Sequence, residues 1–252
     1  MAMQKRSVAI VLLLAAFRLA AQNAPVHVLA SNGMRAVIDQ LKPQAERAIG
    51  QPLEIEFDTS SSVKRRIEGG AAFDVAILTS DVIGDLAKTG KIAAGTRTEI
   101  ARCGIGIGVR AGASKPDIRT IEALKKTLLA AKSIVYAQDG ASKVYLLAMF
   151  DRFGIADVMK TKTVLEQGSV QSNARVADGS AEMVLTLVSE ILPAKGIELV
   201  GPLPAAVQHY VDFAAGIGAN SKNTDSGKKL TKYFASPAVA PTLKAKGMES
   251  PR

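Results

Sequence analysis

The chain has 252 residues, of which 22% are charged and 48% hydrophobic, and its formal net charge is +9 at pH 7. A positive excess of this kind favours a small anionic ligand or an anionic surface. Aromatic residues make up only 4% of the chain and the basic residues form no long run, so nucleic acid is not expected as a partner. A single cysteine, Cys103, excludes an internal disulfide, and the apolar run around it predicts a buried thiol.

The N-terminal segment has the pattern of an export signal. Lys5 and Arg6 precede an apolar run over residues 8–17, and small residues follow that run. We therefore expect residues 1–21 to be a signal peptide and the mature protein to lie in the periplasm. Because Arg18 is irregular for a cleavage region, a buried N-terminal helix or an uncleaved anchor stays an alternative. Removal of the segment would lower the formal charge from +9 to +6, and no later stretch is apolar enough to span a membrane.

Strands and helices alternate along the first hundred residues. Apolar alternation predicts strands at 25–31, 52–59 and 73–80, and helical spacing follows each of them, at 33–50, 61–70 and 81–91. Pro43 is expected to divide or kink the first helix. A succession of this kind is typical of a mostly parallel sheet with helices on both of its faces.

The same alternation restarts after an extended run at 98–112 and ends at a second extended run at 205–219. Between these runs we expect helices at 117–131, 141–153 and 169–179, and strands at 133–138, 161–167 and 182–188. The pattern predicts an α/β fold of two lobes with a ligand cleft between them. The first lobe would comprise 25–102 and 212–252, the second 103–211, with hinge strands near 98–110 and 205–217.

Small polar residues recur where these strands pass into helices, at the end where ligands bind in such folds. They include Ser31, Asn32, Gly33, Ser60, Ser61, Ser142, Ser169 and Thr186. Each of them alone is explained as an ordinary helix cap, which is the expected role of Ser62. Several such junctions on the same side of two sheets predict an anion site built from helix N-termini.

Cations accompany two of these junctions. Lys64, Arg65 and Arg66 occupy successive helical positions, so only one or two of them can face a cleft, and Lys64 or Arg65 is the expected contact. Lys143 lies in the first turn of its helix, where the helix dipole disfavours a cation. A bound anion would offset that cost, which makes Lys143 the stronger candidate.

No catalytic or metal-binding motif is present in the sequence. His27 and His209 lack partners at metal-ligand spacing, so neither a metal nor a cofactor is expected. Four carboxylates lie where they could act as acids or bases if they line the cleft, although a cap or a surface position is the simpler interpretation. They are Asp74, Asp81, Asp139 and Glu190.

The stretch "FDTSSSVKRRIEGGAAFDVAILTSD" (57–81) resembles periplasmic molybdate-binding proteins. The matching positions in that stretch are Ser60, Ser61, Arg65, Ile67, Glu68, Gly70, Asp74 and Asp81. Weaker similarity runs over nearly all of the mature chain. The resemblance implies a type II periplasmic binding fold, in which two lobes close on a small anion and the protein delivers it to an ABC permease in the inner membrane.

The resemblance also implies a ligand site, of which this chain keeps only a part. Ser60 matches a serine of the family's site, and two backbone N–H groups fall near Ser142 and at Val170. Gly33 stands where the family has a second serine, and Leu187 or Val188 replaces the family's tyrosine. Ser31, Asn32 or Thr186 would have to supply the lost hydroxyl donors.

Three functions therefore stay open, of which the third, a sensor or chaperone-like partner of a membrane receptor, has no specific support in the sequence. The first is a monomeric, non-catalytic binding protein for a molybdate-like oxyanion or a small organic carboxylate. The second is an isomerase on the same scaffold, similar to aconitate isomerase, in which Asp139 or Glu190 would transfer a proton while Lys143 or Arg65 anchors a carboxylate.

Overall fold

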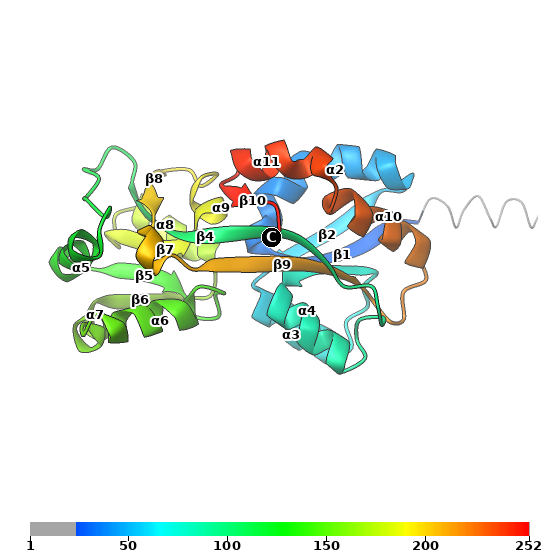
Figure 1. The fold of residues 1–252 in the computed structure, drawn as a ribbon, viewed down its shortest axis with the longest axis horizontal. Helices are drawn as coiled ribbons and strands as arrows, with labels where there is room; N and C mark the ends of the chain where they lie inside the picture. The colour runs from blue at the N-terminus through cyan, green and yellow to red at the C-terminus, as the bar shows by residue number, and fades with distance from the viewer. Residues whose placement is uncertain (1–23, 252) are drawn as a thin grey trace, which may run out of the picture.

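The alternation of strands and helices is present in the structure, a computed structural model that describes residues 24–251. The predicted signal peptide, 1–21, lies outside the described residues. The first part of the chain contains, in order, β1 (Val26–Ser31), the 3-10 helix η1 (Asn32–Met34), α2 (Arg35–Ile49), β2 (Leu53–Asp58), α3 (Ser60–Glu68), β3 (Val75–Thr79), α4 (Ser80–Lys88) and β4 (Thr98–Arg110). These elements, with the C-terminal segment, build the lobe at the right of Figure 1.

Helices cover both faces of the sheet in this first lobe. Because side chains alternate along a strand, Val28 and Ala30 on β1 pack in the core beneath α2, whereas Leu29 packs in the separate core that α3 and α4 cover. Strands β2 and β3 pair with β1 in parallel. Figure 1 shows α2 on one face of this sheet and α3 and α4 on the other.

The middle of the chain forms the second lobe by the same construction. It contains α5 (Ile121–Ala130), β5 (Ile134–Ala137), α6 (Lys143–Arg152), α7 (Ala156–Lys162), β6 (Thr163–Glu166), α8 (Ser169–Ala177), β7 (Met183–Leu187), α9 (Val188–Ile191) and β8 (Ile197–Pro202). Ile134 and Tyr136 pack on one face of β5, and Val135 packs on the other face with Val176 of α8. Strand β5 is parallel to both β6 and β7.

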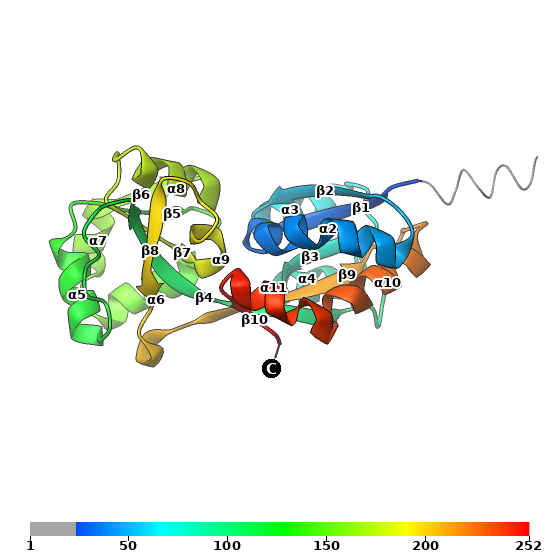
Figure 2. The same cartoon turned by 90° about the horizontal axis from the view of Figure 1, so that it is seen from above.

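Two strands run between the lobes, β4 and β9 (Tyr210–Ile217), the latter preceded by the 3-10 helix η2 (Ala205–Val207). Strand β4 pairs with β9 from Thr98 to Gly104 and with β7 from Ile105 to Val109, so it belongs to the sheets of both lobes. Both pairings are antiparallel, whereas the pairings inside each βαβ unit are parallel. Figures 1 and 2 show β4 and β9 side by side in the waist of the molecule.

The C-terminal segment returns to the first lobe. It contains α10 (Thr224–Phe234), the 3-10 helix η3 (Pro237–Val239), α11 (Ala240–Ala245) and β10 (Met248–Glu249), and both helices contact α2. The carboxylate of Asp74 holds the start of this segment, because it accepts hydrogen bonds from Ser221 at 2.7 Å and from Asn223 at 3.0 Å. No helix among residues 24–251 is long and apolar enough to cross a membrane.

Three local expectations need correction. Pro43 does not divide its helix, because α2 continues unbroken through it to Ile49. Ser62 does not cap α3: the hydroxyl of Thr59 accepts from the backbone N–H of Ser62, whose own hydroxyl donates to Asp58. The extended run expected at 205–219 begins with η2, and its strand starts only at Tyr210. The thiol of Cys103 is buried, as expected, and burial raises its pKa to about 11.

Candidate functional site

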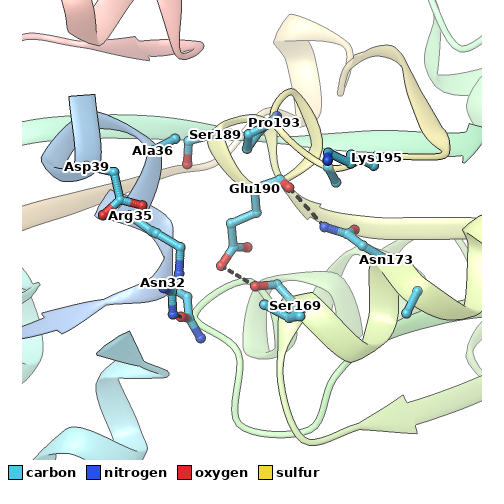
Figure 3. Close-up of a pocket in the computed structure, with 13 residues that line it drawn as sticks. Asn32, Arg35, Ala36, Asp39, Ser169, Asn173, Ser189, Glu190, Pro193 and Lys195 are labelled. Carbon is cyan, nitrogen blue, oxygen red and sulfur yellow. Dashed lines mark hydrogen bonds between the residues drawn. The ribbon is translucent and has the colours of Figure 1, made fainter. Parts of the chain in front are cut away.

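A pocket of about 370 Å³ lies between the two lobes. Its lining comes from η1 and α2 of the first lobe and from α8, α9 and the following turn of the second lobe (Figure 3). The polar and charged side chains among the lining residues are Asn32, Arg35, Asp39, Ser169, Asn173, Ser189, Glu190 and Lys195. The lobes therefore meet around a space that offers hydroxyl, amide, carboxyl and cationic groups together.

Glu190 is the carboxyl group held most firmly in this pocket. The hydroxyl of Ser169 donates to its Oε1 at 2.8 Å, and the hydroxyl of Thr186 donates to its Oε2. Asn173 donates to the backbone carbonyl of the same residue at 2.9 Å. Burial raises the pKa of Glu190, although the bonds from Thr186 and Ser169 oppose the rise. Glu190 is therefore an oriented carboxyl group that resists ionisation.

The first-lobe side of the pocket is the turn from β1 into α2. Ser31 lies at the end of β1, where its hydroxyl accepts from the N–H of Gly33 at 3.3 Å, so it acts as a cap. Asn32 lines the pocket and accepts from Arg35 at 3.1 Å. The guanidinium of Arg35 also lies 4.2 Å from the centre of the Phe57 ring, which fixes its place at the pocket edge.

Gly33 is packed closely against Phe213 and against Leu187 of the second lobe. A Cβ at this position would lie 2.7 Å from Cζ of Phe213 and 2.9 Å from Cδ1 of Leu187, both closer than real contacts allow. Its carbonyl accepts a buried hydrogen bond of 2.8 Å from the hydroxyl of Ser189. The side chains of a second-lobe strand and of β9 therefore fill the space that a serine would need here.

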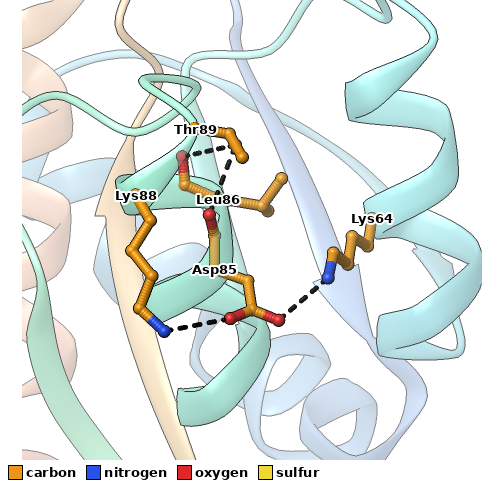
Figure 4. Close-up of polar contacts among 5 residues, drawn as sticks. All are labelled: Lys64, Asp85, Leu86, Lys88 and Thr89. Carbon is orange, nitrogen blue, oxygen red and sulfur yellow. Dashed lines mark hydrogen bonds and ion pairs between the residues drawn. The ribbon is translucent and has the colours of Figure 1, made fainter.

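The α3 junction uses most of its polar groups inside its own lobe. The hydroxyl of Ser60 is buried and accepts from the N–H of Thr79 at 3.1 Å, which leaves its proton available. Ser61 is partly buried in the first turn. Lys64 does not reach the pocket, because it forms an ion pair of 2.9 Å with Asp85 on α4 (Figure 4). The hydrogen bond to Asp85 raises the pKa of Lys64.

Arg65 is the cation of this cluster that spans the two lobes. It pairs with Asp139, which follows β5 of the second lobe, at 2.8 Å. Its neighbour Arg66 pairs with Glu56 of the first lobe at 2.6 Å. The three adjacent cations thus have three different partners, and only one of the pairs crosses the cleft.

The remaining predicted residues lie at the second-lobe junctions. Ser142 is buried directly before α6, and Lys143 opens that helix partly exposed, with no ion pair to another residue in the described part of the chain. Val170, in the first turn of α8, is 57% exposed and lines the pocket. The hydroxyl of Thr186 is used by Glu190, so this residue positions the carboxyl rather than offering a free donor.

Two cations of the pocket, Arg35 and Lys195, were not predicted from the sequence. Arg35 follows Asn32 by three residues at a helix start, which is a weak signal, and Lys195 lies in a turn after α9 that carries no recognisable motif. Four expected residues line the pocket, namely Asn32, Ser169, Val170 and Glu190. The other expected residues are not part of its lining, namely Ser31, Gly33, Ser60, Ser61, Lys64, Arg65, Ser142, Lys143 and Thr186.

Known proteins match this chain over nearly its full described length. The model of the bacterial extracellular solute-binding proteins matches residues 26–249. An aconitate isomerase from Pseudomonas sp is 28% identical over 228 residues, which cover 88% of this chain and 86% of that protein. The molybdate-binding protein ModA from Azotobacter vinelandii is 27% identical over 237 residues, which cover 90% of this chain and 91% of that protein.

A solved structure agrees with these relatives. The periplasmic molybdate-binding protein of Azotobacter vinelandii superposes with a TM-score of 0.76, covering 90% of this chain and all of that chain at 18% identity. The fold is thus the two-lobed type II periplasmic binding fold that the sequence predicted. The chain belongs to the bacterial extracellular solute-binding protein family.

Proposed function

We propose that this extracellular solute-binding protein binds a small organic di- or tricarboxylate between its lobes. Donors for the carboxylates would be Asn32 and the first turn of α8, which line the pocket. Ser60 and Lys143, at the starts of α3 and α6, lie outside this lining and would reach the ligand on closure of the lobes. The pocket volume of about 370 Å³ supports an organic anion, because pockets for such ligands begin at roughly 300 Å³. Arg35 and Lys195, which line the pocket beside the acidic Asp39 and Glu190, provide cations that could pair with carboxylate groups.

The observation that carries this choice is the crowding at Gly33. A serine that binds an oxyanion at this position would need the space that Phe213 and Leu187 occupy. Leu187 also provides no hydroxyl where the resemblance implies a tyrosine. A molybdate-like ligand would therefore lose two donors, whereas a carboxylate can be held by the remaining helix N-termini and a cation.

Export and transport complete the proposal. The segment 1–21 would direct the protein to the periplasm, where a monomer would deliver the bound anion to an ABC permease of the inner membrane. Membership of an extracellular solute-binding family supports this placement.

An isomerase on the same scaffold is the second candidate function. It is favoured by Glu190, a carboxyl group with a raised pKa inside the pocket, and by the similarity to a protein named aconitate isomerase. The two functions share a ligand class and differ in whether the ligand is converted.

Thermal shift measurements test the ligand class. We expect cis-aconitate, trans-aconitate or citrate to raise the melting temperature, because a ligand at about 100 times its Kd adds roughly 2.7 kcal/mol to the free energy of unfolding. Ser60→Ala and Lys143→Ala should each weaken the response. A strong shift with molybdate or tungstate and none with the carboxylates would contradict the proposal.

Gly33→Ser tests the observation itself. We expect the variant to lose about 2 kcal/mol of unfolding free energy, because the added side chain overpacks the contact between the lobes, and to gain no shift with molybdate. Gly201→Ser is the matched control, since a Cβ there would meet Ile118 at an ordinary 3.6 Å. Restored molybdate binding in Gly33→Ser would show that the lost hydroxyl, rather than the filled space, sets the ligand class.

A further inference from the structure

We propose that Glu190 is a catalytic acid–base group that moves a proton between the two allylic carbons of an unsaturated tricarboxylate bound in the interlobe pocket. This inference rests on the proposed carboxylate binding and adds a reaction to it.

The carboxyl of Glu190 is oriented by two hydroxyl groups from different elements. Ser169 at the start of α8 binds Oε1, and Thr186 in β7 binds Oε2. In Figure 3 the carboxyl group points into the space between Ser169 and Asn32, which belong to opposite lobes. A ligand between the lobes would therefore meet this group directly.

No cation neutralises this carboxyl group among the residues that the structure describes. The charged groups that line the same pocket are Arg35 and Asp39 on α2 and Lys195 after α9, and none of them is bonded to Glu190. Cys103 on β4 packs nearby and is un-ionised at neutral pH, because its pKa is raised to about 11. Burial raises the pKa of Glu190 itself, which brings it towards the range where one group can both take and return a proton.

Two of the other candidate carboxylates are bonded to residues of the protein, and the third, Asp81, is exposed in the first turn of α4. Asp139 is paired with Arg65 at 2.8 Å, which occupies one of its carboxylate oxygens. Asp74 is bonded to Ser221 and Asn223 in the first lobe, away from the pocket lining. Of the acids considered from the sequence, Glu190 is the one that lines the pocket.

The hydroxyl partners suit a group that changes its protonation state. A hydroxyl can donate to a carboxylate and, after rotation, accept from a carboxylic acid. Ser169 and Thr186 can therefore stay bonded to Glu190 before and after proton transfer, whereas the backbone N–H of Leu187, which also bonds this carboxyl group, can only donate.

The chemistry needs no further reactant. The Glu190 carboxylate takes a proton from the methylene carbon next to a carboxylate of the ligand, and the C–H electron pair becomes the new carbon–carbon double bond. The electrons of the former double bond take the proton back from Glu190 at the other allylic carbon. Glu190 is again a carboxylate at the end, and the ligand has exchanged the positions of its double bond and its methylene group, which permits cis–trans interconversion.

Proton NMR of cis- and trans-aconitate in D2O tests this assignment. We expect the wild-type protein to exchange the methylene and vinyl protons for deuterium and to interconvert the two isomers. Glu190→Gln should lower both rates by about 100-fold or more while the thermal shift with aconitate persists. Glu122→Gln, which changes an exposed glutamate on α5 of the same lobe, is the matched control and should leave both rates unchanged.

A second variant distinguishes positioning from chemistry. Thr186→Val removes the hydroxyl that lowers the pKa of Glu190, so the acidic limb of the pH profile of kcat/KM should move to higher pH. An unmoved limb with an unchanged rate would contradict the role of Thr186.

The outcomes separate this inference from the proposed function. Aconitate that stabilises the wild type without any deuterium exchange would overturn the inference and leave carboxylate binding standing. Exchange that continues undiminished in Glu190→Gln would overturn the assignment of this residue. If aconitate neither binds nor exchanges its protons, the catalytic inference and the proposed binding are both wrong for this ligand. If citrate or another carboxylate then still shifts the melting temperature, only the proposed carboxylate binding remains.

Discussion

Asp74 in the first lobe and Glu190 in the second are both carboxyl groups bonded by neighbouring side chains, but the two lobes treat their charge in opposite ways. Burial pushes the pKa of Asp74 upwards, yet bonds from Asn223, Ser221 and the backbone N–H of His27 outweigh it and leave the pKa below its usual value. For Glu190 burial dominates, and the pKa is raised.

The donors explain this difference. The side-chain NH2 of Asn223 and the backbone N–H of His27 can donate a hydrogen bond but cannot accept one. A proton on the carboxyl group of Asp74 would therefore face a group that cannot accept it. The two side-chain donors to Glu190 are hydroxyls, which can reverse their bonds. The first lobe thus uses its buried carboxylate as a fixed cross-link, whereas the second lobe holds one whose protonation can change.

The largest effect expected from this comparison is on stability in the first lobe. Asp74→Ala would leave three partly buried donors without their acceptor and should cost about 3 kcal/mol of unfolding free energy at pH 7, measured by urea denaturation. Because the folded pKa is depressed, this contribution is present above the unfolded value near 3.9 and is lost as pH falls through the folded value. The unfolding free energies of the wild type and of Asp74→Ala should therefore become equal at acidic pH.

The control for this prediction is Glu68→Ala, which removes an exposed carboxylate from α3 of the same lobe. It should change the free energy of unfolding by about 0.5 kcal/mol or less. A loss below about 1 kcal/mol in Asp74→Ala would show that Asp74 is not a cross-link.

An intermediate effect is expected from pH at Glu190. Its folded pKa is raised, so the folded state binds the proton more tightly and stability falls as pH rises from the unfolded value near 4.3 towards the folded value. Glu190→Gln lacks this loss, and its advantage over the wild type should grow with pH by at most about 1.4 kcal/mol per unit. Melting curves from pH 4 to 8 measure the difference in stability between Glu190→Gln and the wild type. A difference that shrinks as pH rises would contradict the raised pKa of Glu190.

The smallest effect concerns the ion pair that joins the lobes. Arg65→Ala removes the exposed pair with Asp139 and should weaken carboxylate binding by no more than about fivefold, since such pairs contribute up to about 1 kcal/mol. Arg66→Ala is the matched control, because its pair with Glu56 lies within one lobe. Calorimetric titration with citrate at low and high salt measures the binding affinity of both variants. Equal losses of affinity in the two variants would show that Arg65 has no role in the closure of the lobes.

The sequence determined the local elements and their order. Apolar alternation with intervening helical spacing predicted the βαβ units, and the stretch at 57–81 predicted the family and the type II fold. These signals are readable because they depend on neighbours within a few positions, such as the alternation of Val28, Leu29 and Ala30 on β1. The junction at Asn32 was predicted in the same way, whereas Val170 was predicted only by the resemblance to molybdate-binding proteins.

Only the tertiary structure decided how the charged and polar groups are used. Lys64 and Arg65 are adjacent in sequence, but one pairs with Asp85 inside the first lobe and the other with Asp139 across the cleft. Gly33 is required by Phe213 and Leu187, which lie more than 150 positions away. Contacts between residues so far apart in sequence depend on how the lobes pack, and no local pattern predicts them. The resemblance to an oxyanion site could therefore be read from the sequence. The filling of the space beside Gly33 by Phe213 and Leu187 could not.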